Sequence, residues 1–255
     1  MNKQRVIVLN DVSDVTEEVR NRIIKNDLDV LQVNYNCDYS SPSPFDGMYK
    51  LAEIKFKIQL GDNVKSLFGF FYNCVSLKSV PLFDTSNVAN MEAMFADCKA
   101  LETVPLFDTS KVTNMIYMFC GCPALKSIPQ FDTRKVTNMS SMFTRCKTIK
   151  SVPQFNTSNV TDMRVMFLSC ESLRSVPLFD TKNVTNVEAM FGYCKVLKTV
   201  PLFNTKNVTN MRNMFNGCKS LKSVPLFDTK RVANMSFMFW DCQSLKSVPL
   251  FDTKM

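Results

Sequence analysis

The chain has no histidine among its 255 residues. This absence removes the side chain that most often serves as a general base and most often binds metal ions in proteins. No nucleophile and base pair, phosphate-binding loop or set of metal ligands stands out elsewhere in the sequence. The sequence therefore predicts a protein that is not an enzyme, with no catalytic residue, no cofactor and no metal site.

Long apolar runs are also missing. A membrane-spanning helix needs roughly 18 apolar residues in succession, and the uncharged apolar stretches here are only a few residues long. Near the start, the apolar run Val6–Leu9 follows Lys3 and Arg5 and is shorter than the core of a secretory signal. We expect no membrane span, no signal peptide and no lipid-modified cysteine.

A repeat of 24 residues runs through the sequence from about residue 61 onward. Its unit reads approximately F-[DN]-T-x-x-V-T-N-M-x-x-M-F-x-x-C-x-x-L-x-x-V-P-L. Three columns recur without insertion or deletion: Pro81, Pro105, Pro129, Pro153, Pro177, Pro201, Pro225 and Pro249; Cys74, Cys98, Cys122, Cys146, Cys170, Cys194, Cys218 and Cys242; and Thr85, Thr109, Thr133, Thr157, Thr181, Thr205, Thr229 and Thr253. Because every unit follows the same path, we expect eight coils of a solenoid that stack in register.

Each coil carries apolar residues at fixed positions, and one coil cannot bury them alone. The segment L-x-x-V-P is interpreted as a short strand that ends at a proline, which has no N–H to donate. V-T-N-M is interpreted as a second short strand. The spacing in M-x-x-M-F-x-x-C favours a short helical or 3-10 turn, and the column of asparagines is expected to hydrogen-bond from coil to coil.

The string VPLFDTSNVANMEAMFADCKALETVPLFDTSKVTNMIYMFCGCPALKSIP, which begins at Val80, resembles the Mycoplasma-type lipoprotein repeat family. That family is often grouped with the BspA-like leucine-rich-repeat surface proteins. The resemblance covers about Asn63 to Met255 and implies a leucine-rich-repeat-like solenoid, a cell-surface or secreted location, and a role in adhesion or protein binding. It carries over no catalytic residue. The absence of a signal peptide or lipobox departs from the surface members, so a cytoplasmic or virion-associated location stays open.

Residues 1–60 do not repeat and are interpreted as a small α/β cap in front of the solenoid, which occupies residues 61–255. Arg5–Asn10 predicts a strand, Ser13 and Thr16 open a helix that runs to Lys25, and Leu28–Tyr35 alternates as a strand does. A loop over Cys37–Gly47 follows, and Lys50–Leu60 alternates again.

Two polar columns have simpler explanations than metal binding. The cysteines are expected to be buried as small apolar side chains, since stacked thiols do not converge as a disulfide requires. The close pair Cys120 and Cys122 lacks a second pair or a histidine to complete a zinc site. The aspartates, such as Asp108 and Asp132, offer too few oxygens for calcium and are expected to cap turns.

Lysine and arginine outnumber aspartate and glutamate by 31 to 23. A basic column runs through Lys150, Arg174 and Lys198, and the favoured interpretation is a solvated face. Few aromatic residues stand between these cations, so nucleic acid is not expected as a partner.

The units differ most at the two residues after the first methionine of M-x-x-M-F and at the two after M-F. A solenoid displays such positions as one continuous surface. We therefore expect a protein or glycan partner on this helical side of the coils, bound by Tyr117, Arg164, Leu168, Tyr193, Arg212, Asn216, Phe237 and Trp240.

The sequence thus favours a non-catalytic binding protein, adhesin-like or associated with secreted or virion structures. The alternative is a structural component that docks or polymerises through its C-terminal coil. The single tryptophan, Trp240, lies in that coil, and tryptophan is a frequent interface anchor.

Overall fold

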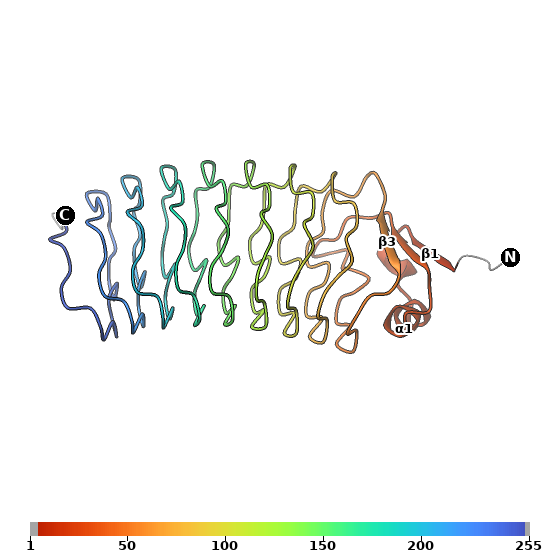
Figure 1. Ribbon diagram of the computed structural model, residues 1–255. Helices are drawn as coiled ribbons and strands as arrows, with labels where there is room; N and C mark the ends of the chain where they lie inside the picture. The colour runs from red at the N-terminus through yellow and green to blue at the C-terminus, as the bar shows by residue number, and fades with distance from the viewer. Residues whose placement is uncertain (1–4, 253–255) are drawn as a thin grey trace.

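The computed structural model describes residues 5–252, so Thr253 lies outside the described part of the chain. The fold begins with a small cap of β1 (Val6–Leu9), a 3-10 turn η1 (Val12–Asp14), α1 (Glu17–Lys25), β2 (Val30–Val33) and β3 (Lys57–Leu60). The three strands form one parallel sheet in the order β1-β2-β3. In Figure 1 the cap closes one end of a row of coils, with α1 beside the sheet.

Helix α1 follows from local signals that the sequence shows. The hydroxyl of Thr16 accepts a hydrogen bond from the Val19 N–H at 3.3 Å, and Glu17 and Glu18 occupy the first turn, where the helix dipole favours negative charge. Asn26 ends the helix in the left-handed conformation. The predicted helix is confirmed, with a separate 3-10 turn ahead of it.

The strands predicted over Arg5–Asn10 and Leu28–Tyr35 are confirmed as β1 and β2. Within Lys50–Leu60 only Lys57–Leu60 forms a strand, which pairs with β2. The segment before β3 instead lies against the first coil, where the Ala52 carbonyl accepts a hydrogen bond from the Lys78 N–H at 3.2 Å.

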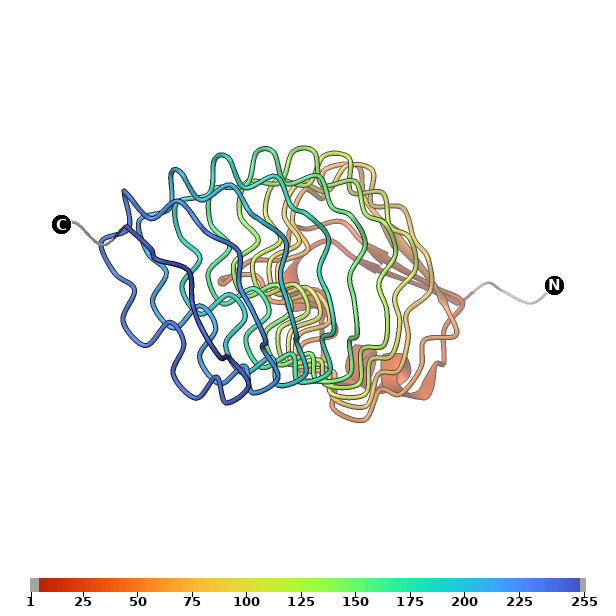
Figure 2. The same ribbon diagram turned by 60° about the vertical axis from the view of Figure 1, so that its left-hand side comes forward.

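The repeats form a leucine-rich-repeat-like solenoid, as Figures 1 and 2 show. The eight coils begin at Val64, Val88, Val112, Val136, Val160, Val184, Val208 and Val232. Parallel bridges link the asparagine column from coil to coil, beginning at Ser66↔Asn90 and ending at Asn210↔Asn234. One hydrophobic cluster extends from Ile7 in the cap to Met238 in the last coil. Equivalent residues of neighbouring coils therefore lie side by side around a shared core, as predicted.

One side of each coil, which we call the turn wall, is the segment Met91–Cys98 and its equivalents. Its odd-numbered residues donate backbone hydrogen bonds to the next coil, as from Met91, Ala93, Phe95 and Asp97 to Asn114, Ile116, Met118 and Cys120. Its even-numbered residues donate within the coil: Glu92 to the side-chain oxygen of Asn90, and the later ones to the carbonyl three residues earlier, as from Ala96 to Ala93. The helical segment expected here is thus a series of turns, because every second N–H is used between coils.

Two residues in each turn-wall segment have positive φ, as at Ala93 (53°) and Asp97 (61°). The left-handed region normally favours glycine. In this protein glycine occupies only some of these positions, such as Gly69, Gly121 and Gly217, and bulkier residues occupy the others. The hydrogen bonds to the next coil hold these residues in a conformation that their side chains disfavour.

The opposite side, which we call the leucine wall, is the segment Leu101–Phe107 and its equivalents. The strand predicted for L-x-x-V-P is wrong: the segment forms no strand, because beyond its second residue no backbone hydrogen bond joins one coil to the next within residues 5–252. Its proline has no N–H to donate. The ring centroids of Phe179 and Phe203 on this wall are 6.3 Å apart, against 5.6 Å for Phe143 and Phe167 on the turn wall, although Phe83 and Phe107 near the cap are 5.1 Å apart.

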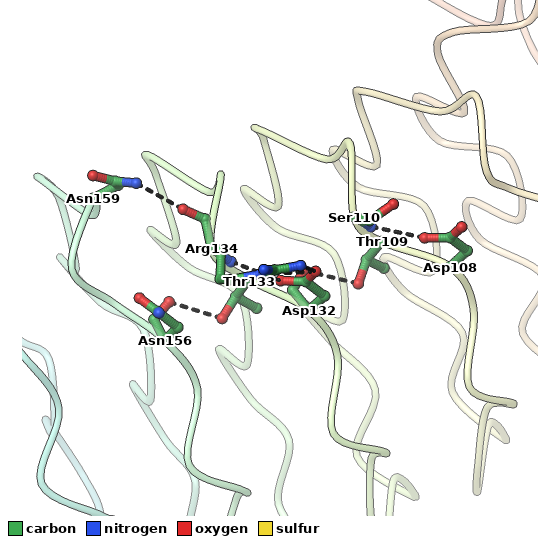
Figure 3. A network of polar contacts seen from close by, with 8 residues as sticks. All are labelled: Asp108, Thr109, Ser110, Asp132, Thr133, Arg134, Asn156 and Asn159. Atoms are coloured by element: carbon green, nitrogen blue, oxygen red, sulfur yellow. Dashed lines mark hydrogen bonds and ion pairs between the residues drawn. The ribbon is translucent and has the colours of Figure 1, made fainter.

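A turn that carries the aspartate and threonine columns joins the leucine wall to the next bridge (Figure 3). The buried Thr109 hydroxyl donates to the Asp132 carbonyl of the next coil at 2.9 Å. The Asp108 carboxylate accepts from the Ser110 N–H at 2.9 Å, and this bond lowers the pKa of Asp108. The prediction that the aspartates cap turns is confirmed.

Several asparagine side chains hydrogen-bond from coil to coil as predicted, but to a serine or glutamate of the preceding coil rather than to one another. The Asn114 side-chain oxygen accepts from the Ile116 N–H at 3.0 Å within its own coil, and the Asn114 amide donates to Glu92 at 2.9 Å. The backbone, not a ladder of asparagine side chains, makes the connection between coils.

All ten cysteines are free thiols, and most are buried. The Cys146 thiol donates to the Phe119 carbonyl at 3.1 Å, and the other column members bond in the same way to a carbonyl of the preceding coil or, for Cys74, of the cap. Burial raises the pKa of Cys37 and Cys74 to about 12. The thiols thus serve as small core residues, as predicted.

Candidate functional site

The eight residues proposed from the sequence to bind a partner all belong to the turn wall. Arg164 and Arg212 follow the first methionine of their segments, and Tyr117 and Phe237 stand one position later. Leu168, Asn216 and Trp240 follow the M-F pair, with Tyr193 one position after them. The structure therefore brings these residues to one side of the rod, although they come from five different coils.

Three of these large side chains are exposed in the left-handed conformation. Tyr117, Tyr193 and Phe237 have φ values of 56°, 58° and 57°. Glycines in the following coil leave space for Tyr193 and Leu168. A Cβ on Gly217 would lie 2.6 Å from the Tyr193 ring, and one on Gly192 would lie 2.9 Å from Leu168. Tyr193 and Leu168 thus each lie over a glycine of the next coil.

The two arginines are held by nearby acids. Arg164 pairs with Asp162 at 3.2 Å, and Arg212 pairs with Glu188 of the preceding coil at 3.6 Å. Because all four side chains are at least partly exposed, each pair contributes little to stability. The pairs orient the guanidinium groups along the surface and partly neutralise their charge.

Phe237 and Trp240 form one aromatic cluster in the last coil. Their ring centroids are 5.8 Å apart in an edge-on arrangement, and 63% of Trp240 is exposed. Asn216, like Leu168, is only partly exposed, whereas the other six residues are exposed. The Asn216 amide nitrogen donates to Asn213 at 3.0 Å, while its side-chain oxygen is buried without a partner.

Comparison with known proteins identifies the family to which the repeat belongs. The sequence profile of a family described as Mycoplasma protein of unknown function, DUF285, matches residues 63–176 and 171–254. The chain belongs to this family. The DUF285 match spans the coils and begins after β3, so the family's repeat is the 24-residue coil with its turn wall and leucine wall.

Two solved leucine-rich-repeat proteins resemble this DUF285 member. One, from Bacteroides ovatus, is 19% identical with a TM-score of 0.44 over 88% of this chain and 67% of the other. The second, from Eubacterium ventriosum, is 17% identical with a TM-score of 0.36 over 80% of this chain and 74% of the other. Both likenesses concern the fold. No curated protein matches the chain.

The sequence reasoning missed a second exposed feature of the DUF285 coils. The residue after the proline is a leucine in six coils, and these leucines are exposed: Leu82, Leu106, Leu178, Leu202, Leu226 and Leu250. The signal was present, since the leucine column is replaced by Gln130 and Gln154 in two coils. A core position seldom accepts glutamine.

The cap also contributes to the turn wall, which the sequence reasoning did not foresee. Tyr39, in the loop between β2 and β3, lies 4.2 Å from the ring of Phe68 in the first coil. Its hydroxyl donates to Glu92 of the second coil at 3.5 Å. The loop is far from these residues in sequence, and only the packing of the cap on the solenoid brings them together.

Cys120 lies on the turn wall but outside the cysteine column. It is half-buried, and burial raises the pKa of its thiol. Residues 5–252 contain no cluster of three or more histidine, cysteine, aspartate or glutamate side chains placed to hold a metal. In the same part of the chain, no helix is long and apolar enough to cross a membrane.

Proposed function

We propose that this protein is a non-catalytic binding module that recognises a partner protein through its turn wall. The leucine-rich-repeat-like fold is typical of protein-interaction modules, because its coils present an extended surface. The proposal assigns the contacts to the residues that vary between coils on the turn wall.

The observation that carries this proposal is the identity of the residues with positive φ. A left-handed backbone costs roughly 1–2 kcal/mol for a residue with a side chain, and Gly69, Gly121 and Gly217 show that glycine is tolerated there. Tyr117, Val165 and Tyr193 occupy the same kind of position. Stability alone favours glycine at these sites, so a bulky exposed residue indicates a role outside the fold.

The composition of the wall supports a protein partner. Tyrosine, tryptophan, phenylalanine and arginine are enriched in protein interfaces, and these types supply Tyr193, Trp240, Phe237 and Arg164 here. A glycan remains the other partner class, since exposed aromatic rings also stack on sugars. The adhesin-like role and the surface location rest on the family resemblance and belong to the same proposal.

Site-specific photo-crosslinking tests which wall binds. A benzoylphenylalanine is placed at Tyr193 on the turn wall or, as the matched control, at Leu202 on the leucine wall; both residues are exposed. In an extract from the source organism, we expect a discrete crosslinked protein from the Tyr193 position alone. An equal or stronger product from the Leu202 position would contradict the proposal.

Charge reversal gives a second test once the partner is captured. Arg164→Glu with Arg212→Glu is compared with Lys150→Glu and Lys198→Glu on the leucine wall. We expect the turn-wall pair to weaken capture about tenfold or more, and the leucine-wall pair to change it little, as measured by surface plasmon resonance. The reverse order would assign the contact to the leucine wall.

A second candidate function is docking through the last coil. The backbone N–H groups of Met235, Phe237, Phe239 and Asp241 have no acceptor among residues 5–252, whereas the equivalent groups of the preceding coils bond to the next coil. Under this proposal the exposed rings of Phe237 and Trp240 contact a second copy or a partner. Light scattering would show mass that rises with concentration and is reduced by Trp240→Ala, and a constant monomer mass would exclude self-association.

A further inference from the structure

A cavity of about 420 Å³ lies at the cap end of the turn wall, where the loop between β2 and β3 meets the first two coils. The loop contributes Asp38, Tyr39 and Asp46, the first coil contributes Phe68 and Tyr72, and the second coil contributes Ala93. A volume of this size accommodates one large side chain. The cavity is distinct from the partner-binding residues chosen from the sequence, which begin at the third coil.

Aromatic rings form much of the cavity surface. Tyr39 is 85% exposed, and its ring lies against Phe68 at a tilt of 49°. Tyr72 is also exposed. Rings that keep their faces free around a cavity can cover the aliphatic part of a side chain and can attract a cation to their π electrons.

The carboxylate of Asp46 lacks a partner. Asp46 is half-buried, and its side chain makes no hydrogen bond or ion pair within residues 5–252. The Arg20 guanidinium donates to the Asp46 backbone carbonyl at 2.8 Å and not to its carboxylate. The carboxylate oxygens of Asp46 therefore keep their capacity to accept a hydrogen bond from a bound cationic group.

Besides Asp46, two further acidic residues, Asp38 and Glu92, lie around the cavity. Asp38 lines the cavity, and hydrogen bonds from Ser40 and Ser41 lower its pKa, which keeps it ionised. Glu92 stands at the rim, bonded to the Tyr39 hydroxyl. A chain with a net charge of +8 therefore has an acidic, aromatic cavity at this one end of the turn wall.

We propose that this cavity receives a lysine or arginine side chain of the partner protein. The aliphatic stem of that side chain packs on Tyr39 and Phe68, and its charged head reaches Asp46 beside the ring of Tyr72. The acidic charge favours a cationic group over a neutral sugar. This inference deepens the proposed function, because it names the chemical group that one end of the turn wall recognises.

The test uses the full chain and short capped peptides, followed by NMR of the backbone amides of Tyr39, Gly69 and Ala93. The probe is acetyl-Gly-Gly-Arg-Gly-Gly-amide, and its matched control contains citrulline, which has nearly the same shape without the charge. We expect saturable shifts with the arginine peptide and at least about tenfold weaker binding of the citrulline peptide. Equal binding of the two peptides, shifts with maltose of similar size, or no shift at all would overturn the inference.

Two variants locate the site. Asp46→Asn removes the unpaired charge and should weaken the arginine peptide about tenfold, while Asp62→Asn, at an exposed carboxylate outside the cavity, should leave binding unchanged. Tyr39→Ala should weaken it several-fold, and folding is not at risk because Tyr39 is almost fully exposed. Unchanged binding by Asp46→Asn would overturn the inference.

The outcomes separate this inference from the proposed function. Partner crosslinks at Tyr193 without arginine binding would support the turn wall as the binding surface and contradict the assignment of the cavity to it. Arginine binding at the cavity with partner crosslinks at Leu202 would support the cavity as a binding site and contradict the turn wall as the main contact.

Discussion

The turn wall and the leucine wall enclose the same core but are held in different ways. Phe119 from the turn wall and Phe131 from the leucine wall meet in that core at 6.3 Å. Every coil before the last extends backbone hydrogen bonds from its turn wall to the next coil, whereas the leucine wall has almost none. One wall is connected by its backbone and the other by its side chains.

The difference explains where the repeats vary. On the turn wall the backbone carries the connection, so side chains can change from Glu188 to Arg212 without breaking it. On the leucine wall the valine, proline and phenylalanine recur because their packing is the connection. Where glutamine replaces leucine, its side chain adds the missing bond: Gln130 donates to the Gln154 carbonyl at 2.7 Å, and Gln154 to the Leu178 carbonyl at 2.9 Å.

The largest expected effect comes from high pH, which acts on the core between both walls. Burial raises the pKa of the thiols above their ordinary value of 9.0, to about 12 for Cys37 and Cys74. Unfolded thiols ionise near pH 9 while folded ones stay neutral, so this stability is complete below pH 9 and is lost as pH rises toward the folded pKa values. Each such thiol contributes a slope of about 1.4 kcal/mol per pH unit.

Urea unfolding under reducing conditions at pH 8, 9 and 10 checks this loss, which should reach several kcal/mol. The double variant Cys146→Ala with Cys170→Ala should reduce the slope by about 3 kcal/mol per pH unit. A stability that stays flat between pH 8 and 10 would show that the thiols are not buried as neutral groups.

The next largest effect should come from the leucine-wall core. Phe155→Ala removes a buried ring that no backbone bond can replace, and we expect a loss of about 3–5 kcal/mol in urea unfolding. Leu178→Ala, on the same wall but 58% exposed, should cost less than about 0.5 kcal/mol. Similar costs for the two variants would mean that the exposed leucines are covered in solution.

A smaller effect is expected at the turn that joins the walls. Thr157→Val keeps the shape but removes the hydroxyl that donates to the Asp180 carbonyl at 2.9 Å, and should cost about 1 kcal/mol. The control is Thr161→Val, whose exposed hydroxyl makes a longer bond of 3.3 Å. Thermal unfolding should separate the two, and an equal loss would argue against the buried threonine as a link between coils.

The smallest expected effect is a gain in stability, not a loss. Val165 has a φ of 49°, so Val165→Gly relieves strain and should stabilise the protein by up to about 1 kcal/mol. Val176→Gly, at a buried leucine-wall position, should destabilise it. If both variants destabilise to a similar degree in urea unfolding, the valine at position 165 is not strained.

Much of the fold could be predicted from sequence because the repeat is exact. Equal units without insertions must follow equal paths, so the columns of Cys146, Phe155 and Thr157 pointed directly to stacked coils and a shared core. The strands β1 and β2 and helix α1 followed from alternation and capping. The turns of the turn wall could not be predicted, because nothing in Tyr117 or Val165 signals a positive φ.

The sequence by itself determined the period, the number of coils and which columns are buried, since those depend on the order of apolar residues alone. The tertiary structure decided which wall carries the hydrogen bonds, because the contact with the next coil imposes the left-handed residues. It also created the acidic cavity, because Asp46 and Tyr72 meet only when the cap packs on the first coil.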